Sequence, residues 1–411
     1  MKRIKLLFLL ILCIPASAQI QIGVDIDGEA AGDESGYSVS LSSDGTRVAI
    51  GAYGNDGAGG SAGHVRIYEY SAGSWTQLGA DIDGESVYDK SGQSVSLSAD
   101  GTRVAIGARL NDGNNNDAGH VRIYEYSAGS WSQLGADIDG EDINDNSGCS
   151  VSLSSDGSTV AIGAKNHSLS KGHTRIYEYS AGSWTQLGAD LDGEAFYDHS
   201  GYSVSLSSDG TRVAIGAYGN DGAGGSAGHV RIYEYSAGSW TQLGADIDGE
   251  SVYDKSGQSV SLSADGTRVA IGARLNDGNG TDAGHVRIYE YSAGSWTQLG
   301  VDIDGEAAGD ESGFSVSLSS GGDTVAIGAN YNTGAGGNAG HARIYEYSAG
   351  SWSQLGADLD GEAVGDNSGQ SVSLSSDGTT VAIGAPFNDG NGTDAGHVRV
   401  YSICFDTIQQ Q

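Results

Sequence analysis

The sequence is poor in cysteine, proline and positive charge, and each shortage excludes a class of protein. Its 411 residues include 3 Cys and 2 Pro, and 20 Lys and Arg stand against 53 Asp and Glu. So few cysteines cannot build the disulfide framework of a small secreted domain, and so little proline excludes a collagen triple helix. The net charge of −33 argues against nucleic acid as a partner, because phosphate binding needs clustered Lys and Arg. We therefore expect packing alone to stabilise the fold.

Long apolar runs are also missing after the first residues. Three basic residues precede an apolar run over 6–14, and a stretch of small residues ends at Ala18. This layout is typical of a secretory signal peptide, so we predict removal of residues 1–18 and export to the periplasm, the outer surface or the extracellular space. The run is far shorter than the ~20 residues that cross a bilayer, and no later stretch reaches that length. The sequence therefore predicts no membrane span.

Glycine and internal repeats are abundant. The chain has 68 Gly, and a segment of the type Q-[LI]-G-x-D-[IL]-D-G-E begins seven times at spacings of 53 or 56 residues, at Gln21, Gln77, Gln133, Gln186, Gln242, Gln298 and Gln354. Strand-built periods of this size indicate a propeller or a solenoid. The segment Ser35–Asn114 is identical to Ser200–Asn279, so a block of three units has been copied whole.

Each unit is predicted to form four strands, which in the first unit cover 38–42, 47–52, 64–70 and 75–82. The last unit lacks its fourth strand, and residues 19–26 form such a strand standing alone at the other end. Closure by the N-terminal strand explains both ends, whereas an open solenoid would need capping units. We predict an all-β, seven-bladed propeller of four-stranded antiparallel blades over 19–402, followed by a tail at 403–411.

Two segments resemble a known repeat. The stretch Ser312–Val316 reads S-G-F-S-V, and Ile383–Pro386 reads I-G-A-P. Together they are similar to the FG-GAP repeat of integrin alpha-subunit propellers and related bacterial surface proteins. The resemblance implies a seven-bladed propeller used for adhesion or ligand binding, with a D-x-D-x-D-G calcium loop between strands one and two. Here that connection is the tight turn Ser42–Thr46, so the metal residues of the family do not carry over.

The acidic residues gather in the connection from each fourth strand to the next first strand. Carboxylates spaced two apart and followed by Gly offer the oxygen ligands that calcium needs. Alternatively, they are solvated turns whose carboxylates cap backbone N–H groups. The candidate calcium ligands are Asp25, Asp27, Glu29 and Asp33, then Asp81, Asp83, Glu85 and Asp89, and their equivalents in the other units.

The two long connections of each unit, from strand two to three and from four to one, leave the blades on the same face. Variation between units falls in these loops, and binding residues usually lie on loops held by a rigid scaffold. In the third unit this loop is three residues shorter and contains Lys165, His167 and Lys171, which indicates a local basic contact or simple drift. The seven histidines that precede the third strands are interpreted as structural partners of neighbouring acids, or as a metal-binding ring.

No sequence motif of a hydrolase, zinc protease or nucleotide-binding loop occurs, so no catalytic residue is predicted and no cofactor other than calcium. Our leading hypothesis is an exported, non-enzymatic adhesion or recognition propeller, monomeric, that binds a protein or glycan through its acidic variable-loop face. One alternative is a propeller hydrolase or lyase that acts on extracellular polysaccharide. Another is a purely structural surface protein.

Overall fold

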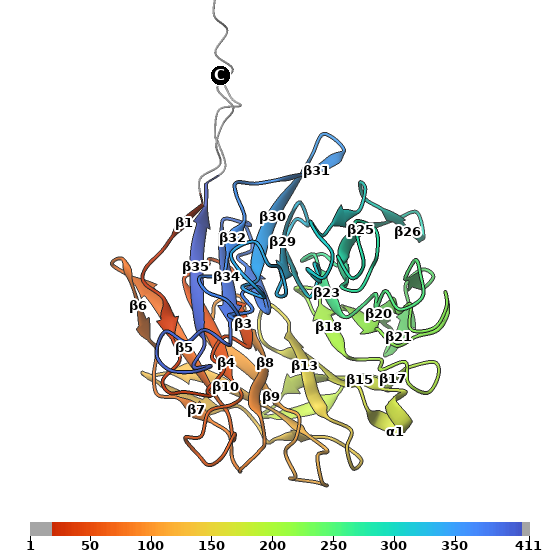
Figure 1. Cartoon of the computed structure of the whole chain (residues 1–411). Helices are drawn as coiled ribbons and strands as arrows, with labels where there is room; N and C mark the ends of the chain where they lie inside the picture. The colour runs from red at the N-terminus through yellow and green to blue at the C-terminus, as the bar shows by residue number, and fades with distance from the viewer. Residues whose placement is uncertain (1–18, 405–411) are drawn as a thin grey trace, which may run out of the picture.

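A computed structural model describes residues 19–404, and the predicted signal peptide lies outside this range. Seven small antiparallel sheets surround a central axis, as predicted, and form a seven-bladed propeller (Figure 1). Among the described residues, no helix is long and apolar enough to cross a bilayer.

The first blade shows the plan of all seven. Its sheet runs in the order β3 (Ser38–Leu41), β4 (Arg47–Ala52), β5 (His64–Ser71) and β6 (Ser74–Gln77), from the axis to the rim. The sequence predicted one continuous fourth strand over 75–82, and this prediction is wrong. The structure divides the segment into β6 and β7 (Ile82–Asp83), and each piece pairs with β5. Gly79, with a φ of +80°, turns the chain between the two pieces, and a side chain at that φ would be strained.

The other blades repeat this order, and their strands have nearly the same lengths except that the first strand of the second and third blades has 7 residues instead of 4. In the third blade the connection between strands two and three contains α1 (His167–Ser170), where positive φ values at Ser168 and Leu169 make a left-handed turn. The strands are β8 (Ser91–Leu97), β9 (Arg103–Ala108), β10 (His120–Ser127), β11 (Ser130–Gln133), β12 (Ile138–Asp139); β13 (Ser147–Leu153), β14 (Thr159–Ala164), β15 (His173–Ser180), β16 (Ser183–Gln186), β17 (Leu191–Asp192); β18 (Ser203–Leu206), β19 (Arg212–Ala217), β20 (His229–Ser236), β21 (Ser239–Gln242), β22 (Ile247–Asp248); β23 (Ser259–Leu262), β24 (Arg268–Ala273), β25 (His285–Ser292), β26 (Ser295–Gln298), β27 (Ile303–Asp304); and β28 (Ser315–Leu318), β29 (Thr324–Ala329), β30 (His341–Ser348), β31 (Ser351–Gln354), β32 (Leu359–Asp360).

The seventh blade is assembled from both ends of the chain, which confirms the predicted closure. It contains β33 (Ser371–Leu374), β34 (Thr380–Ala385) and β35 (His397–Ile403), and its outer strand consists of β1 (Gln19–Gln21) and β2 (Ile26–Asp27). Gln19 pairs with Ile403, so β35 extends one residue beyond the predicted domain end. A single sheet therefore holds the first and last strands together.

The alternation of Ser with Val and Leu in each innermost strand follows from the contacts between blades. The Ser38 hydroxyl donates to the Gly92 carbonyl of the next blade at 2.8 Å, and the Ser40 hydroxyl accepts from the Leu97 N–H at 3.0 Å. Val39, on the opposite face of the strand, packs into one of seven apolar clusters, each formed between two adjacent blades. Polar links and apolar packing thus use alternate residues.

Close approach of the blades depends on a glycine in the second strand. A Cβ atom at Gly51 would lie 1.9 Å from the Gly92 carbonyl oxygen of the next blade. No side chain fits in that space, so close packing of the blades requires glycine in the I-G-A segment of each unit.

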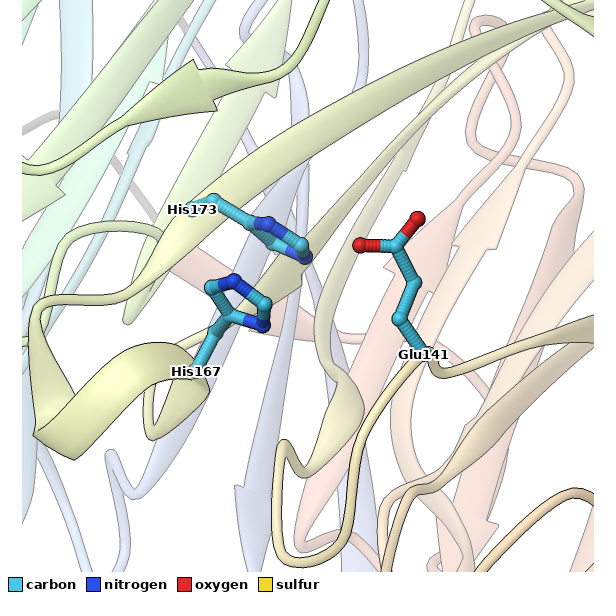
Figure 2. A group of neighbouring side chains, drawn as sticks. All are labelled: Glu141, His167 and His173. Atoms are coloured by element: carbon cyan, nitrogen blue, oxygen red, sulfur yellow. The ribbon is translucent and has the colours of Figure 1, made fainter.

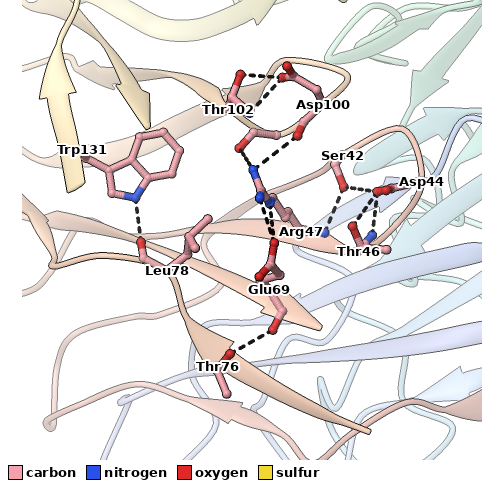
Figure 3. Close-up of polar contacts among 11 residues, drawn as sticks. Ser42, Asp44, Thr46, Arg47, Glu69, Thr76, Leu78, Asp100, Thr102 and Trp131 are labelled. Carbon is pink, nitrogen blue, oxygen red and sulfur yellow. Dashed lines mark hydrogen bonds and ion pairs between the residues drawn. The ribbon is translucent and has the colours of Figure 1, made fainter. Parts of the chain in front are cut away.

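The turns between strands one and two form a closed ring around the axis. The Ser43 N–H donates to the Ala99 carbonyl of the next blade at 2.8 Å, and the pattern continues to Ser376, whose N–H donates back to Ser43 at 2.9 Å. Asp44 holds the first of these turns in shape by accepting hydrogen bonds from Ser42 and Thr46 (Figure 3).

A second ring of contacts joins the blades at the rim. The Trp131 indole N–H donates to the Leu78 carbonyl of the preceding blade at 2.7 Å (Figure 3), and the other five tryptophans make the equivalent bond. In the seventh blade, which lacks a tryptophan, the Gln19 side chain donates to the Leu355 carbonyl at 2.8 Å instead.

Candidate ligand-binding site

Three positions in each unit change from blade to blade, and each lies beside a short segment that repeats. The first position precedes the invariant Ser-Gly pair, the second follows that pair, and the third follows the I-G-A segment of strand two. In chain order they are occupied by Glu34, Lys90, Asn146, His199, Lys255, Glu311 and Asn367; by Tyr37, Gln93, Cys149, Tyr202, Gln258, Phe314 and Gln370; and by Tyr53, Arg109, Lys165, Tyr218, Arg274, Asn330 and Pro386.

The propeller brings these positions together at one mouth of its central channel. The second position of all seven blades, together with Lys165, lines a cavity of about 150 Å³. This mouth lies on the face of the long loops, because its lining residues lie at the beginning of strand one or directly follow strand two. The opposite mouth holds a cavity of about 140 Å³ lined by repeated Leu, Ser and Ala residues. Chemical variety is therefore confined to one end of the channel.

Most cations without a repeated structural role lie at this mouth. Outside the predicted signal peptide, eleven arginines recur at two fixed positions, where they bind glutamates or backbone carbonyls, as Arg47 and Arg66 do. Six basic residues remain: Lys90, Arg109, Lys165, Lys171, Lys255 and Arg274. All of these except Lys171 occupy the variable positions. In a chain of net charge −33, the mouth is thus a local concentration of positive charge.

The cations at the mouth lie against aromatic rings. The ammonium of Lys90 is 4.6 Å from the centre of the Tyr53 ring, and that of Lys165 is 4.8 Å from the centre of the Tyr202 ring. The Arg274 guanidinium lies 5.6 Å from the Phe314 ring. Such contacts hold the cations in place while leaving their N–H groups available. Burial lowers the pKa of Lys90 from its usual value.

The two copied blocks place the same tyrosine pair in different surroundings. Tyr37 and Tyr53 meet edge to face at 4.4 Å, and Tyr202 and Tyr218 do so at 4.6 Å. Burial, followed by the neighbouring Glu34 carboxylate, raises the pKa of Tyr53 far above its usual value. In the other copy, His199 replaces the glutamate and stacks on Tyr218. The duplication therefore did not make two identical sites.

Arg109 and Arg274 occupy copied positions, but only one of them is paired with a carboxylate. Arg274 forms an ion pair with Glu311 and a hydrogen bond with Gln258. Arg109 bonds to Gln93, but within residues 19–404 it has no ion-pair partner. Its positive charge is therefore available to an anionic ligand.

Some buried polar atoms at the mouth have no hydrogen-bond partner. In the described part of the chain these include the Glu34 Oε2, His199 Nδ1 and Asn330 Oδ1 atoms. A buried polar atom without a partner is costly, so a bound molecule or water would stabilise each of them. The mouth thus offers cations, flat rings and unsatisfied polar atoms to a ligand.

The predicted calcium ligands of one connection separate into different environments. Asp33 is 2% exposed, and its Oδ2 atom accepts from the backbone N–H groups of Glu29 at 3.1 Å and Ala30 at 2.9 Å. In the next connection, Asp89 accepts from the Ser86 N–H and the Asn111 side chain, both at 2.9 Å. This last carboxylate of each connection closes its own loop.

The other carboxylates meet a histidine across two connections. The His64 Nδ1 atom lies 4.0 Å from Glu29 of one connection and 3.9 Å from Asp81 of the next. Asp27, in β2, accepts a hydrogen bond from the Arg66 side chain through its backbone carbonyl, and its side chain is exposed. Asp83 accepts from Arg122 in the same way, whereas the Glu85 carboxylate lies 3.5 Å from Arg122 and 3.9 Å from His120. His397 likewise lies 3.9 Å from Asp25 of one connection and 3.9 Å from Glu362 of another. Sequence spacing grouped the acids of one loop and missed this mixing of neighbouring loops, which the interleaving of blades produces.

Comparison with known proteins supports the architecture. The model of the FG-GAP repeat family matches residues 357–401. The structure resembles a hydrazine synthase from Kuenenia stuttgartiensis, with a TM-score of 0.58 and 13% sequence identity, over 94% of this chain and 98% of that one. It also resembles a candidate 6-phosphogluconolactonase from Bacteroides uniformis, with a TM-score of 0.56 and 12% identity, over 79% and 85% of the two chains.

The comparison with curated proteins finds no match. At such low identity, the two solved structures share the fold of this chain and indicate nothing about its ligand. The seven repeats and the sheet order confirm a seven-bladed propeller, and the family match identifies an FG-GAP repeat in its last unit, at residues 357–401.

Proposed function

We propose that the protein is an exported, non-enzymatic recognition propeller that binds a glycan bearing carboxylate or sulfate groups at the channel mouth. The observation that carries this proposal is the convergence of the variable positions of all seven units on that mouth. Packing accounts for the residues that repeat, and it leaves the variable ones unexplained. The sequence led us to expect the ligand on the acidic loops of this face, and we now place it at the centre of the same face, at the channel mouth.

The chemistry of the mouth favours an anionic glycan over an acidic protein loop. Arginine forks bind carboxylates and sulfates, and the flat faces of tyrosine rings pack against sugar rings. The cavity of about 150 Å³ is smaller than the ~300–1,000 Å³ pockets that enclose drug-sized molecules. It fits one ring of a larger chain, with the remainder on the surrounding loops, where Tyr88, Tyr197 and Tyr253 are exposed.

A binding assay on the protein lacking residues 1–18 tests the proposal. Acidic oligosaccharides are expected to bind, neutral ones of the same length are not, and Arg109→Ala or Lys165→Ala should weaken binding at least tenfold. Lys171→Gln removes a positive charge away from the mouth and should leave the affinity unchanged. Equal loss in all three variants, or no binding of any acidic glycan, would overturn the proposal.

A second candidate, a lyase of acidic polysaccharide, is favoured by one observation. His199 lies at the mouth beside Tyr218, and burial, followed by Lys165, lowers its pKa, so it is a neutral base at pH 7. A lyase removes the proton next to a uronate carboxylate and expels the 4-linked sugar oxygen. Burial raises the pKa of Tyr218, which keeps its hydroxyl protonated, the form that can donate a proton to the expelled oxygen. Unsaturated products, absent with His199→Ala, would support the lyase over simple recognition.

A further inference from the structure

A second histidine joins the repeated histidine cluster in the third blade. Seven of the nine histidines recur as the first residue of strand three, and the other two are His167 and His199. His167 stands where the other six units have asparagine, as at Asn111. In those units the loop to strand three is longer, whereas here α1 brings the His167 ring onto the His173 ring.

The two rings face a carboxylate from the neighbouring blade. Their centres are 4.1 Å apart with 17° between the planes, and Figure 2 shows the Glu141 carboxylate in front of both. One nitrogen of each ring and one oxygen of Glu141 lie within 4.8 Å of one another. The His173 Nδ1 atom is also 4.0 Å from Asp190. These distances leave the nitrogens too far from the oxygens for hydrogen bonds and leave space for an ion between them.

His173 supplies an independent sign that a ligand is missing from this cluster. Its side chain is fully buried, and in the described part of the chain both of its ring nitrogens are buried without a hydrogen-bond partner, whereas in the other six repeated histidines only the Nε2 atom is. A buried imidazole whose nitrogens have no partner is costly, and a metal ion would accept the lone pair of one of them.

The surroundings of the cluster suit a cation. Asp145 is almost fully buried, and its Oδ2 atom lies 3.1 Å from the His167 Nδ1 atom, which fixes the ring and adds negative charge. Arg175 pairs with Glu141 at 3.3 Å, so one oxygen of that carboxylate is engaged. Carboxylates that orient histidine ligands are typical of transition-metal sites.

We propose that His167, His173 and Glu141 bind one divalent transition-metal ion, of the zinc, copper or nickel type, with Asp190 within reach as a fourth ligand. Two imidazoles and carboxylate oxygens match these metals and not calcium, which takes oxygen ligands. Because the rings are stacked, at least one must tilt for both nitrogens to face the ion. The six other units, with one histidine each, lack the second nitrogen.

Metal titration of the protein lacking residues 1–18 tests this site. One equivalent of Cu²⁺ or Zn²⁺ should bind with a Kd below about 10 µM. His167→Asn installs the residue of the other six units and should weaken binding at least a hundredfold. Glu141→Gln should weaken it by at least tenfold, and Lys171→Gln, in the same loop, should leave it unchanged.

The spectrum of bound Cu²⁺ gives a second readout. Paramagnetic resonance should report two nitrogen ligands in the parent protein, and far-UV circular dichroism should show that all variants fold. Seven equivalents of metal that are insensitive to His167→Asn would assign binding to the repeated clusters and overturn the proposal. A Kd in the millimolar range for both metals would also overturn it.

Discussion

At the scale of single residues, the repeats act as internal controls. A residue present in all seven units supports the blade, and a residue that differs among them at one place has another role. Asn111 donates to the buried Asp89, and in the third unit His167 takes the same place beside Asp145. The sequence marked His167 as an exception, but it could not reveal the contact with His173, since that contact depends on the path of a shortened loop.

Gly51→Ala should destabilise the protein more strongly than an ordinary surface change. The added Cβ atom would overlap the Gly92 carbonyl, and relief requires two blades to separate. We expect a loss of about 3 kcal/mol in the free energy of unfolding, measured with urea. Gly73→Ala is the control: it has the left-handed φ of +89° but no atom within 4 Å, and should lose about 1 kcal/mol. Equal losses would show that the close approach is unimportant.

Arg109→Ala and Arg274→Ala should affect ligand binding unequally. The two arginines occupy copied positions, but Arg274 is neutralised by Glu311 and Arg109 has a free charge. We expect Arg109→Ala to weaken binding of an acidic oligosaccharide at least tenfold more than Arg274→Ala does, measured by calorimetry. Glu311→Gln should then raise the affinity by freeing Arg274. Equal effects of the two arginine variants would contradict the predicted difference.

At the scale of elements, the strand order could be predicted from the sequence, and the interruption of the fourth strand could not. The alternation in 38–42 and the turn at Asp44 fix β3 and β4 directly. The break between β6 and β7 depends on the Leu78 carbonyl, which turns outward to accept the Trp131 side chain of the next blade. A contact between blades therefore sets a local bend that no single unit shows.

Removing residues 19–27 should open the seventh blade. The truncated chain loses β1 and β2, leaves β35 as an exposed edge and uncovers Val398, which is fully buried in the complete propeller. We expect the melting temperature to fall by at least 10 °C, because an apolar cluster and a row of backbone hydrogen bonds are lost. A synthetic peptide of residues 19–27 should restore the melt at saturation, whereas a peptide with Ile26→Asp should not. An unchanged melt after truncation would mean that closure adds little.

Calcium binding by the acidic connections stays a prediction, and melting in EDTA and in millimolar calcium tests it. Burial, followed by the neighbouring Asp25, raises the pKa of Asp27 above its usual value, and a bound cation would offset this crowding of negative charge. At 100 times its Kd, a ligand adds about 2.7 kcal/mol per site, so seven sites would raise the melting temperature clearly. Asp27→Asn should reduce the rise. An unchanged melt would assign the connections to solvated turns.

At the scale of the whole molecule, seven buried histidines should make stability depend on pH. Burial, followed by the adjacent arginine, outweighs the facing carboxylates and lowers the pKa of His120 and His285 to about 4. Because the unfolded pKa is about 6.5, the unfolded chain binds more protons below that pH, and stability falls between about pH 6.5 and pH 4. Each proton contributes up to about 1.4 kcal/mol per pH unit.

Urea unfolding at a series of pH values measures this dependence. We expect the slope of the unfolding free energy against pH to correspond to several protons between pH 6 and 5. The His120→Asn variant should lower that slope by about one proton. A stability that is flat from pH 7 to 5 would contradict the prediction.

The channel mouth is formed by all seven blades together, and for that reason the sequence alone did not predict it. Tyr37 and Tyr202 are 165 positions apart in the chain, yet both line one cavity because the blades radiate from one axis. Repeat spacing predicted the axis and the face on which the long loops lie. It could not predict that the five cations without a repeated structural role gather there, since that depends on which side chains at the ends of the inner strands face the channel.

The pairing of Gln19 with Ile403 has a mechanical consequence. The two strands are antiparallel, so a force that pulls the two ends of the propeller apart loads their hydrogen bonds one after another, as in a zipper, and opens the closing blade at low force. A force that enters through Ile403 and leaves through a molecule held at the channel mouth does not pull this pair apart. It instead spreads over seven blades joined in closed rings. The propeller would therefore withstand drag on its ligand when tethered by one end, and would open if stretched between both.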